Sequence, residues 1–300
     1  MGMLEGKSIA VTGAGRGIGR AVAIACAEAG ASVVVNDYGV SMDGSEPTSE
    51  PANEVVEEIR SKGGKAVANP SSVATMDGGA SIVKQAVDEF GSIDGVVCVA
   101  GILREKMLFN MAEDEWDPVI ETHLKGHFTL FRAASAVMRK QKSGSLIGFT
   151  SGAFAGSVAQ ANYASAKGGI VSLVRSAAAG LNKYGVRANC IAPTAKTRMS
   201  ENVPFEIADM GGPEDIAPMA VYLLSDASKD VTGQIYSVAG GKLAVWNQPV
   251  EVRSVYKEGG WTPEEIAERL DSTIGQEKMG LLEKLAMYAK AAAAKQKPNA

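Results

Sequence analysis

A glycine-rich turn near the start of the chain constrains the fold more than any other stretch. Residues Ser8–Thr12 are apolar and β-branched, as in a buried strand, and the glycine run GAGRGIG follows at once over residues 13–19. A helical pattern covers residues 20–29, and a second apolar strand over residues 31–36 ends at Asp37. This order of strand, glycine turn, helix, strand and acid predicts a βαβ unit that binds a dinucleotide.

Glycines in such a turn let the backbone approach a pyrophosphate, whose charge the helix N-terminus then meets. The carboxylate of Asp37 is placed to accept hydrogen bonds from ribose hydroxyls and to repel a 2′-phosphate, which favours NAD over NADP. Arg16, a cation inside the turn, argues in the other direction, so NADP stays open. The residues expected at the pyrophosphate are Gly13, Gly15, Arg16, Gly17, Ile18 and Gly19.

Strands and helices alternate along the chain as far as Gly241, and nothing in the alternation marks a domain boundary. Further strands are expected at residues 65–69, 95–100, 145–149, 187–191 and 234–238, and helices at 52–62, 79–90, 116–139, 163–184 and 213–224. The pattern predicts an α/β fold, a doubly wound parallel sheet of about seven strands flanked by helices. We expect one domain over residues 1–241.

Residues 242–300 differ in character and are expected to form a partly helical C-terminal extension. Thr262-Pro-Glu-Glu265 has the composition of a helix start, with Thr as the N-cap. Apolar residues between 279 and 288 form a possible helix face before the chain becomes rich in Ala and Lys. This helix packs on the domain or on a neighbouring subunit, or its end frays.

Composition excludes several classes of protein. The chain of 300 residues is 46% hydrophobic with a net charge of −4, which supports a sizeable core and argues against a nucleic-acid partner. Its three cysteines form no Cys-x-x-Cys pair, which predicts neither a disulfide framework nor a zinc site. No signal peptide, membrane span or Ser-Lys-Leu ending is present in the sequence. We therefore expect a soluble cytoplasmic protein with no membrane partner.

Tyr163 and Lys167 are four residues apart in an alanine-rich helical stretch, so they share one helix face. An ammonium close to a phenol lowers the pKa of the phenol, and such a tyrosine can exchange a proton with a substrate oxygen. On an arbitrary helix this spacing more often marks a solvated pair. The surrounding motifs favour the chemical interpretation here.

These motifs together resemble those of the short-chain dehydrogenase/reductase family, from Gly6 to about Gly241. They are Thr12-Gly-x-x-x-Gly17-x-Gly19, Tyr163-x-x-x-Lys167, Arg187-x-Asn189-x-Ile-x-Pro193 and Val238-x-Gly-Gly241. The resemblance implies a Rossmann-type fold and an NAD(P)-dependent oxidoreductase that acts on CH–OH groups. It also implies a homodimer or homotetramer formed through the long helices.

Within the family the chain is most similar to the hydroxyacyl-CoA dehydrogenase domain of peroxisomal multifunctional enzyme type 2. It is also similar to bacterial hydroxyacyl-CoA and hydroxysteroid dehydrogenases. The finer resemblance is carried by Val35-Asn-Asp37-x-Gly39, Ala100-Gly-Ile-Leu-Arg104, His123-Leu-x-Gly126, Gln160-Ala-Asn-Tyr163 and Ile191-Ala-Pro-x-Ala-x-x-Arg198-Met199.

By this resemblance Tyr163 is the catalytic acid/base, and Lys167 binds the nicotinamide ribose and lowers the Tyr pKa. A hydroxyl from the preceding strand is expected to bind the substrate oxygen. Counting back from Tyr163 selects Thr150, whereas counting forward from Gly144 selects Ser151. Since strand register fixes the face of a side chain and loops absorb deletions, we favour Ser151.

His123 occupies the family's fourth catalytic position, which is usually Asn. We expect it either to hold a water in a proton relay or to be structural, and His127 to be structural. These are the only histidines, and no carboxylate lies between them, so no metal site is predicted.

The resemblance implies further cofactor contacts at Ser72, Val73, Ala100, Gly101, Pro193 and Thr197. Two positions depart from the family pattern: Cys98-Val99 replaces an Asn pair, and Ser72 replaces an Asp.

The leading hypothesis is an NAD-dependent enzyme that interconverts a secondary alcohol and a ketone. The segment 197–213, where the family has its substrate lid, is short and apolar, which favours a bulky apolar substrate such as an acyl-CoA or a steroid. One alternative is an NADPH-dependent 3-oxoacyl carrier-protein reductase. Another is a catalytically idle dinucleotide-binding sensor or scaffold.

Overall fold

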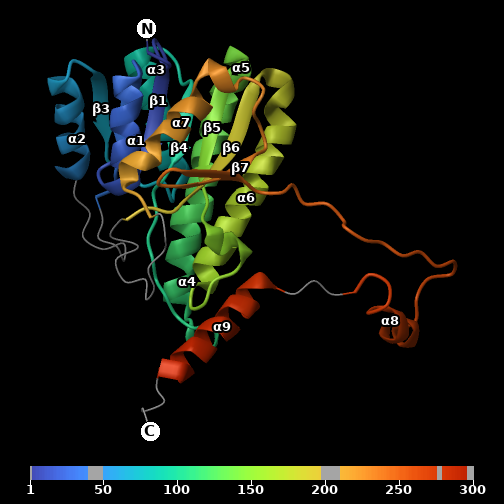
Figure 1. Ribbon diagram of the computed structural model, residues 1–300. Coiled ribbons are helices and arrows are strands. Elements are labelled where there is room, and N and C mark those ends of the chain that lie inside the picture. Colours follow the sequence, from blue (N-terminus) through green and yellow to red (C-terminus); the bar gives the residue numbers. More distant parts are fainter. Residues whose placement is uncertain (1, 40–49, 197–209, 276–278, 296–300) are drawn as a thin grey trace. The chain divides into compact units, whose positions relative to one another are not determined.

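A single eight-stranded sheet forms the centre of the fold, in the order β3-β2-β1-β4-β5-β6-β7-β8 (Figure 1). The computed structural model describes residues 2–39, 50–196, 210–275 and 279–295. Seven strands pair in parallel, and only β8 runs antiparallel to its neighbour. The strands are β1 Ser8–Thr12, β2 Ser32–Asn36, β3 Lys65–Asn69, β4 Gly95–Cys98, β5 Gly144–Phe149, β6 Val186–Pro193, β7 Ile235–Ala239 and β8 Lys242–Val245.

Helices cover both faces of this sheet, as expected for a doubly wound topology. Helices α1, α2 and α7 pack on one face, and α3, α5 and α6 pack on the other. The α-helices are α1 Gly17–Glu28, α2 Glu50–Ser61, α3 Met76–Phe90, α4 Glu113–Ile120, α5 Gly126–Gln141, α6 Ala161–Leu181, α7 Ala217–Leu224, α8 Pro263–Arg269 and α9 Gly280–Lys295. Short 3-10 turns include η3 Gly152–Ala155, η4 Asn182–Tyr184, η6 Pro213–Asp215 and η7 Asp226–Ser228.

Side chains of the central strands alternate between two apolar cores. On β1, Ile9 and Val11 pack with α1, α2 and α7, whereas Ala10 packs with α3 and α5. On β4, Val97 packs in the core with Ile9 and Val11, and its neighbour Val96 packs in the core with Ala10. All are fully buried. Because both faces are covered, the strands read as continuous apolar runs rather than as an alternating pattern.

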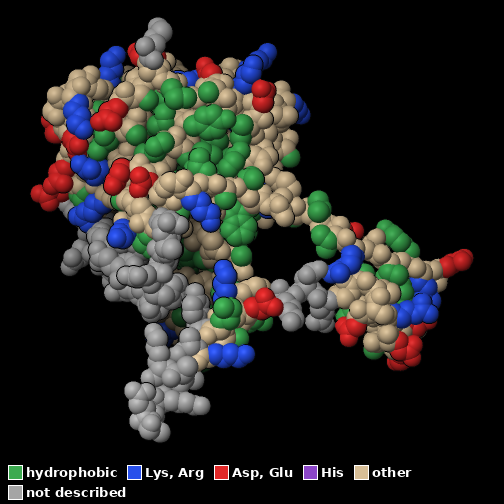
Figure 2. All heavy atoms as spheres, in the orientation of Figure 1, with side chains coloured by type: hydrophobic (Ala, Val, Ile, Leu, Met, Phe, Trp, Pro, Cys, Tyr) green, Lys and Arg blue, Asp and Glu red, His purple; other side chains and the backbone are tan. Residues whose placement is uncertain are grey.

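The face formed by α1 and α7 carries an apolar groove between the two helices. Its floor includes Ala21, Ile24 and Ala25 of α1 and Pro218 and Val221 of α7. Figure 2 shows hydrophobic side chains gathered on this face, with charged side chains around them.

The first compact unit ends at Trp246 rather than at Gly241, and residues 247–300 form a second unit. Residues 242–245, which the sequence places in the extension, form β8 and pair with β7. The Trp246 indole donates a hydrogen bond of 2.8 Å to Ser237 Oγ and packs edge-on against Phe154. In the second unit α8 begins as predicted, because Thr262 Oγ1 accepts from the Glu265 N–H and the Glu265 carboxylate accepts from the Thr262 N–H. In the described part of the chain, no helix combines the length and the apolar character that crossing a membrane requires.

The single long helix expected at residues 116–139 is interrupted by a π-helical turn. Helix α4 ends at Ile120, the turn spans Glu121–Lys125 and α5 begins at Gly126. π-helical turns inside α-helices occur frequently at functional sites. This turn carries His123.

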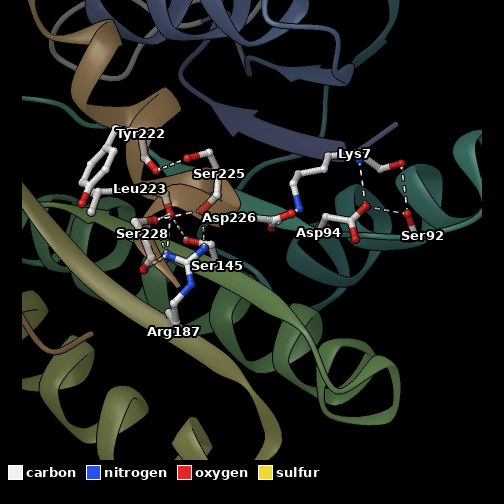
Figure 3. A network of polar contacts seen from close by, with 11 residues as sticks. Lys7, Ser92, Asp94, Ser145, Arg187, Tyr222, Leu223, Ser225, Asp226 and Ser228 are labelled. Atoms are coloured by element: carbon white, nitrogen blue, oxygen red, sulfur yellow. Dashed lines mark hydrogen bonds and ion pairs between the residues drawn. The ribbon is translucent and has the colours of Figure 1, made fainter. Parts of the chain in front are cut away.

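A polar network joins the start of β6 to the C-terminal end of α7, at the end of the sheet where the parallel strands begin (Figure 3). The Arg187 guanidinium donates to the carbonyls of Leu223, Ser225 and Ser228, at 2.8, 3.2 and 3.1 Å. It also donates to Ser228 Oγ at 2.6 Å. A cation at this position satisfies carbonyls that have no partner within the helix and opposes the negative end of its dipole.

Candidate active site

The residues singled out in the sequence meet at the carboxyl edge of the sheet. Strand order reverses between β1 and β4, because β2 and β3 lie on one side of β1 and β5 to β7 lie beyond β4. Ligands of open α/β sheets bind at such a switch point, outside the carboxyl ends of the strands. The glycine turn follows β1, Asp37 follows β2, Ala100 follows β4 and Ser151 follows β5.

The glycine turn has the backbone geometry of a phosphate cradle. Gly13 and Gly17 have φ values of +62° and +52°, which side-chain-bearing residues rarely adopt. A Cβ on Gly19 would lie 2.0 Å from the Gly13 carbonyl oxygen. Helix α1 begins at Gly17 with no acidic residue in its first turn and no side-chain cap from Arg16. Its N-terminal N–H groups and dipole therefore suit an anionic pyrophosphate.

Asp37 is held against this turn by two backbone donors. Its Oδ2 accepts from the Gly15 N–H at 2.7 Å, and its Oδ1 accepts from the Gly39 N–H at 2.7 Å. Each carboxylate oxygen can accept further hydrogen bonds. The carboxylate is thereby fixed at the end of β2, where it suits ribose hydroxyls and repels a phosphate.

The remaining predicted cofactor residues lie around the same edge. Ala100 packs against the turn, since a Cβ on Gly13 would lie 2.7 Å from the Ala100 Cα. Val73 is buried and its carbonyl accepts from Thr129 Oγ1 at 2.7 Å, while Ser72 precedes it in the turn after β3. Pro193 ends β6. Thr197 and the rest of the expected lid up to residue 209 lie outside the described residues.

The two candidate hydroxyls after β5 have different partners. The Thr150 hydroxyl is buried and donates to the Lys167 carbonyl at 2.9 Å, which binds it to the backbone of α6. The Ser151 hydroxyl instead acts on the Tyr163 hydroxyl, whose pKa it lowers, and accepts from the Ala153 N–H at 3.2 Å. Of the two hydroxyls, Ser151 is therefore the one that acts on Tyr163, and Thr150 is bound to the α6 backbone.

Lys167 is buried beneath the tyrosine on the same helix. Its ammonium donates to the Phe149 carbonyl at 2.6 Å and lies 5.3 Å from the centre of the Tyr163 ring. Burial lowers the pKa of Lys167 to about 7.

The expected lowering of the Tyr163 pKa by Lys167 is not found. Burial raises the pKa of Tyr163 to about 12, and only the hydrogen bond from Ser151 opposes this shift. The Lys167 ammonium lies 5.3 Å from the ring centre and directs its donor to the Phe149 carbonyl, while the phenol itself is buried. Desolvation of the phenolate outweighs the remaining attraction.

His123 is buried with its ring edge-on to Tyr163, at 5.1 Å between ring centres. Its Nε2 lies 3.1 Å from the Ile102 nitrogen and 2.8 Å from the Ile102 oxygen. Gly101 is required beside it, because a Cβ there would lie 2.2 Å from His123 Cε1. Its Nδ1 makes no hydrogen bond to any described group.

His127 has a structural position one turn later. Its Nδ1 donates to the His123 carbonyl at 2.7 Å, and its Nε2 accepts from the Phe149 N–H at 3.1 Å. The two rings thus bind backbone groups of different segments. Over the described residues, no cluster of three or more His, Cys, Asp or Glu could hold a metal ion.

Comparison with known proteins shows the family to which this chain belongs. The family model described as enoyl-(acyl carrier protein) reductase matches residues 13–242. A short-chain type dehydrogenase/reductase of Mycobacterium tuberculosis is 45% identical over 243 residues, which cover 80% of this chain and 84% of that protein. The chain belongs to the short-chain dehydrogenase/reductase family. Its members are oxidoreductases that act on CH–OH groups with a nicotinamide dinucleotide, and so does this enzyme.

A solved structure and two further relatives extend the comparison. A short-chain dehydrogenase from Mycobacterium avium has a TM-score of 0.83 at 44% identity and covers 92% of this chain and 97% of its own. The hydroxyacyl-CoA dehydrogenase ChsB1 of Mycobacterium tuberculosis is 38% identical over 288 residues, 89% of this chain and 88% of that protein. Peroxisomal multifunctional enzyme type 2 of Mus musculus is 42% identical over 240 residues, 79% of this chain but only 32% of that longer protein.

The sequence did not single out two polar residues of this dehydrogenase/reductase that hold the backbone around the site. The Thr12 hydroxyl accepts from the Val99 and Ala100 N–H groups, at 3.2 and 3.3 Å, and so joins the ends of β1 and β4. Asn162 bonds three backbone groups beside Tyr163. Both lie within motifs quoted above, but an Asn or Thr side chain can bond local or distant backbone equally well, so the sequence offers no signal for their partners.

The buried histidines make the stability of this enzyme sensitive to acid. Burial lowers the pKa of His127 from 6.5 to about 3, so below pH 6.5 the unfolded chain takes up a proton that the folded chain does not. Stability is therefore lost as pH falls from 6.5 toward 3, by about 2 kcal/mol at pH 5 from this residue. The pKa of His123 is lowered in the same direction, chiefly by burial.

Urea unfolding at pH 7.5, 6.5, 5.5 and 5.0 measures this loss. We expect His127→Gln, which cannot titrate, to be less stable at pH 7.5 but to lose less stability on acidification than the wild type. Parallel pH dependences for the two proteins would contradict the assignment.

Proposed function

We propose that this enzyme is an NAD-dependent dehydrogenase that interconverts a secondary alcohol and a ketone on a bulky apolar substrate, a 3-hydroxyacyl-CoA or a hydroxysteroid. The observation that carries the chemistry is that Ser151 acts on the Tyr163 hydroxyl, whose pKa it lowers, above the buried Lys167. A donor and an acid/base that lie side by side can both reach a single substrate oxygen.

In the oxidative direction Tyr163 takes the proton from the substrate hydroxyl, and Ser151 donates a hydrogen bond to the same oxygen as charge develops there. The bound cofactor supplies the hydride acceptor. Lys167 would bind the cofactor ribose by its remaining N–H donors, while the Phe149 carbonyl holds its ammonium in place. In the reductive direction Tyr163 returns the proton. Its raised pKa keeps the phenol protonated at neutral pH and ready to donate.

His123 adds a second group at the tyrosine. Its ring contacts Tyr163, and Nδ1 is the ring atom left to bind a water in a proton relay. This role is part of the proposal.

Support for NAD comes from Asp37. Two backbone donors fix its carboxylate, so it cannot turn away from a 2′-phosphate without losing both hydrogen bonds. We expect initial rates with NAD to exceed those with NADP, and Asp37→Ala to shift the ratio about tenfold or more toward NADP. Rates that favour NADP in the wild type would contradict this choice.

Support for the substrate class comes from the relatives, one of which is a hydroxyacyl-CoA dehydrogenase and another a multifunctional enzyme of peroxisomes. The test is a panel of 3-hydroxyacyl-CoAs, hydroxysteroids and small polyols, with reduced nicotinamide followed by absorbance. Turnover of a CoA ester or steroid supports the proposal. Turnover restricted to polyols or sugars overturns it.

The two hydroxyls after β5 give a matched pair of variants. Ser151→Ala removes a donor from the reacting oxygen, and we expect kcat to fall by about 10²-fold or more with little change in thermal stability. Thr150→Val removes the hydrogen bond to the Lys167 carbonyl, and we expect it to lower the melting temperature. A larger fall in kcat for Thr150→Val than for Ser151→Ala would reverse the assignment.

An NADPH-dependent 3-oxoacyl carrier-protein reductase is the second candidate, and it is favoured by a relative, the 3-oxoacyl-[acyl-carrier-protein] reductase FabG of Staphylococcus aureus, which is 39% identical over 249 residues. Arg16, exposed at the N-terminus of α1, is the residue available to a 2′-phosphate. Rates with an oxoacyl carrier protein and NADPH distinguish it from the first proposal. A catalytically idle sensor would instead bind NADH tightly and turn over no substrate.

We also propose that the enzyme is a cytoplasmic homodimer or homotetramer that associates through α5 and α6. Phe128 on α5 is 45% exposed, and α6 carries the small residues Ala177 to Ala179. Light scattering on the full chain tests this. A monomer at micromolar concentration would contradict it.

A further inference from the structure

The residue directly before the catalytic tyrosine is a fully buried asparagine that joins three segments of the chain. Asn162 is 1% exposed. Its Nδ2 donates to the carbonyls of Arg104, at 2.8 Å, and Glu115, at 2.7 Å. Its Oδ1 accepts from the Tyr163 N–H at 2.7 Å. One amide thus binds the segment after β4, helix α4 and the first turn of α6.

The first turn of α6 needs such a partner. The first N–H groups of a helix have no acceptor within it, and a cap residue usually supplies one. Gln160 occupies the cap position but makes no capping hydrogen bond. Its Oε1 accepts from Ser157 Oγ at 2.7 Å, and its Nε2 donates to Glu105. Asn162 therefore replaces the cap for the N–H of Tyr163 itself.

Further hydrogen bonds join the segment after β4 to the residues that precede α6. The Lys106 N–H donates to the Ala159 carbonyl at 2.8 Å, and Ala159 has a φ of +59°, which is unfavourable for a residue with a Cβ. Arg104, Glu105 and Lys106 thus contact Asn162, Gln160 and Ala159 respectively. A strained backbone persists only where its surroundings determine it, and such positions gather at functional sites.

We propose that Asn162 is a positioning residue. Its hydrogen bonds hold residues 104–106 and α4 against the start of α6, and this fixes the direction of the Tyr163 side chain. The inference rests on the proposed function, because it assigns a role toward the acid/base of that reaction. Loss of the amide frees Tyr163 at its backbone and frees α4, which continues into the turn that carries His123. Both changes let the Tyr163 hydroxyl move away from the Ser151 hydroxyl that lowers its pKa.

The experiment compares two Asn162 variants with a matched control in the full chain. Asn162→Ala removes all three hydrogen bonds, and Asn162→Asp keeps the acceptor for Tyr163 but loses both donors. The control is Asn189→Ala on β6. Asn189 is also fully buried and bonds two backbone groups, the Val231 carbonyl and the Gln234 N–H, away from the tyrosine. All three variants should lower the melting temperature.

Only the Asn162 variants should change catalysis. We expect kcat to fall by about 10²-fold in both, since small misplacements of a reacting group have effects of this size. In the oxidative direction the acid limb of the kcat profile should move to higher pH, because the base Tyr163 loses the influence of Ser151 that lowers its pKa. NADH affinity should stay within about twofold. Wild-type kcat and pH profile in either Asn162 variant, or an equal shift of the profile in Asn189→Ala, would overturn the proposal.

Hydrogen exchange on the wild type tests whether residues 104–106 are held against α6, and it needs neither an activity assay nor a variant. We expect the peptide that covers residues 102–107 to exchange as slowly as the first turns of α6. Exchange at the rate of an open loop would overturn the proposal. This result does not depend on whether the Asn162 variants fold. Absence of turnover by the wild type would count against the proposed function and leave this measurement intact.

Discussion

Tyr163→Phe should lower kcat by about 10³-fold, within the 10²- to 10⁴-fold range of general acid–base catalysis, while NADH binds as in the wild type. The substitution removes one oxygen atom. The phenylalanine ring keeps the edge contact with His123 and the position above Lys167, so the fold and the cofactor site should persist. What disappears is the proton donor and acceptor at the substrate oxygen.

The measurement is kcat with the preferred substrate of the panel, alongside NADH titration by fluorescence. Tyr184→Phe is the matched control, because Tyr184 lies just beyond α6 and stacks with Lys183 and Arg139. It should keep wild-type activity. An unchanged kcat in Tyr163→Phe would remove the tyrosine from the mechanism. A wild type that binds NADH but turns over nothing would favour the idle sensor.

Arg187→Met should cost about 3 kcal/mol of stability and lower the melting temperature by roughly 6–12 °C. The guanidinium donates to three carbonyls and one hydroxyl at the end of α7 (Figure 3). Methionine fills part of the space but leaves these acceptors without a charged donor. Each carbonyl keeps a neutral donor, from Ser145 and Ser228 at Leu223, from Ser228 at Ser225 and from the Val231 N–H at Ser228, so the expected cost is the loss of the charge-assisted hydrogen bonds.

Thermal unfolding checks this result, and two further variants interpret it. Arg187→Lys keeps the charge but lacks the planar fork, so we expect it to fall between wild type and Arg187→Met. Lys229→Met removes an exposed cation next to Ser228 and should change the melting temperature by no more than about 2 °C. A similarly small shift in Arg187→Met would show that the network contributes little.

Much of the fold follows from local pattern. The turn of residues 13–19, the alternation of strands and helices and the start of α8 at Thr262 all depend on neighbours close in the sequence. Backbone preference and hydrophobic period act at this range. β8 was not foreseen, because Lys242–Val245 is a strand only through its pairing with β7. The π-helical turn at His123 was not foreseen either.

The family, seven of the eight strands and most of the residues at the carboxyl ends of those strands could be predicted from the sequence, since each rests on motifs with fixed spacing. The distinction between Ser151 and Thr150 required the folded chain, because it depends on which hydroxyl acts on Tyr163 and which binds the α6 backbone. The folded chain also reversed the expected pKa of Tyr163 and revealed the contacts of Asn162. Burial and long-range hydrogen bonds depend on groups distant in the chain, and no local pattern encodes them.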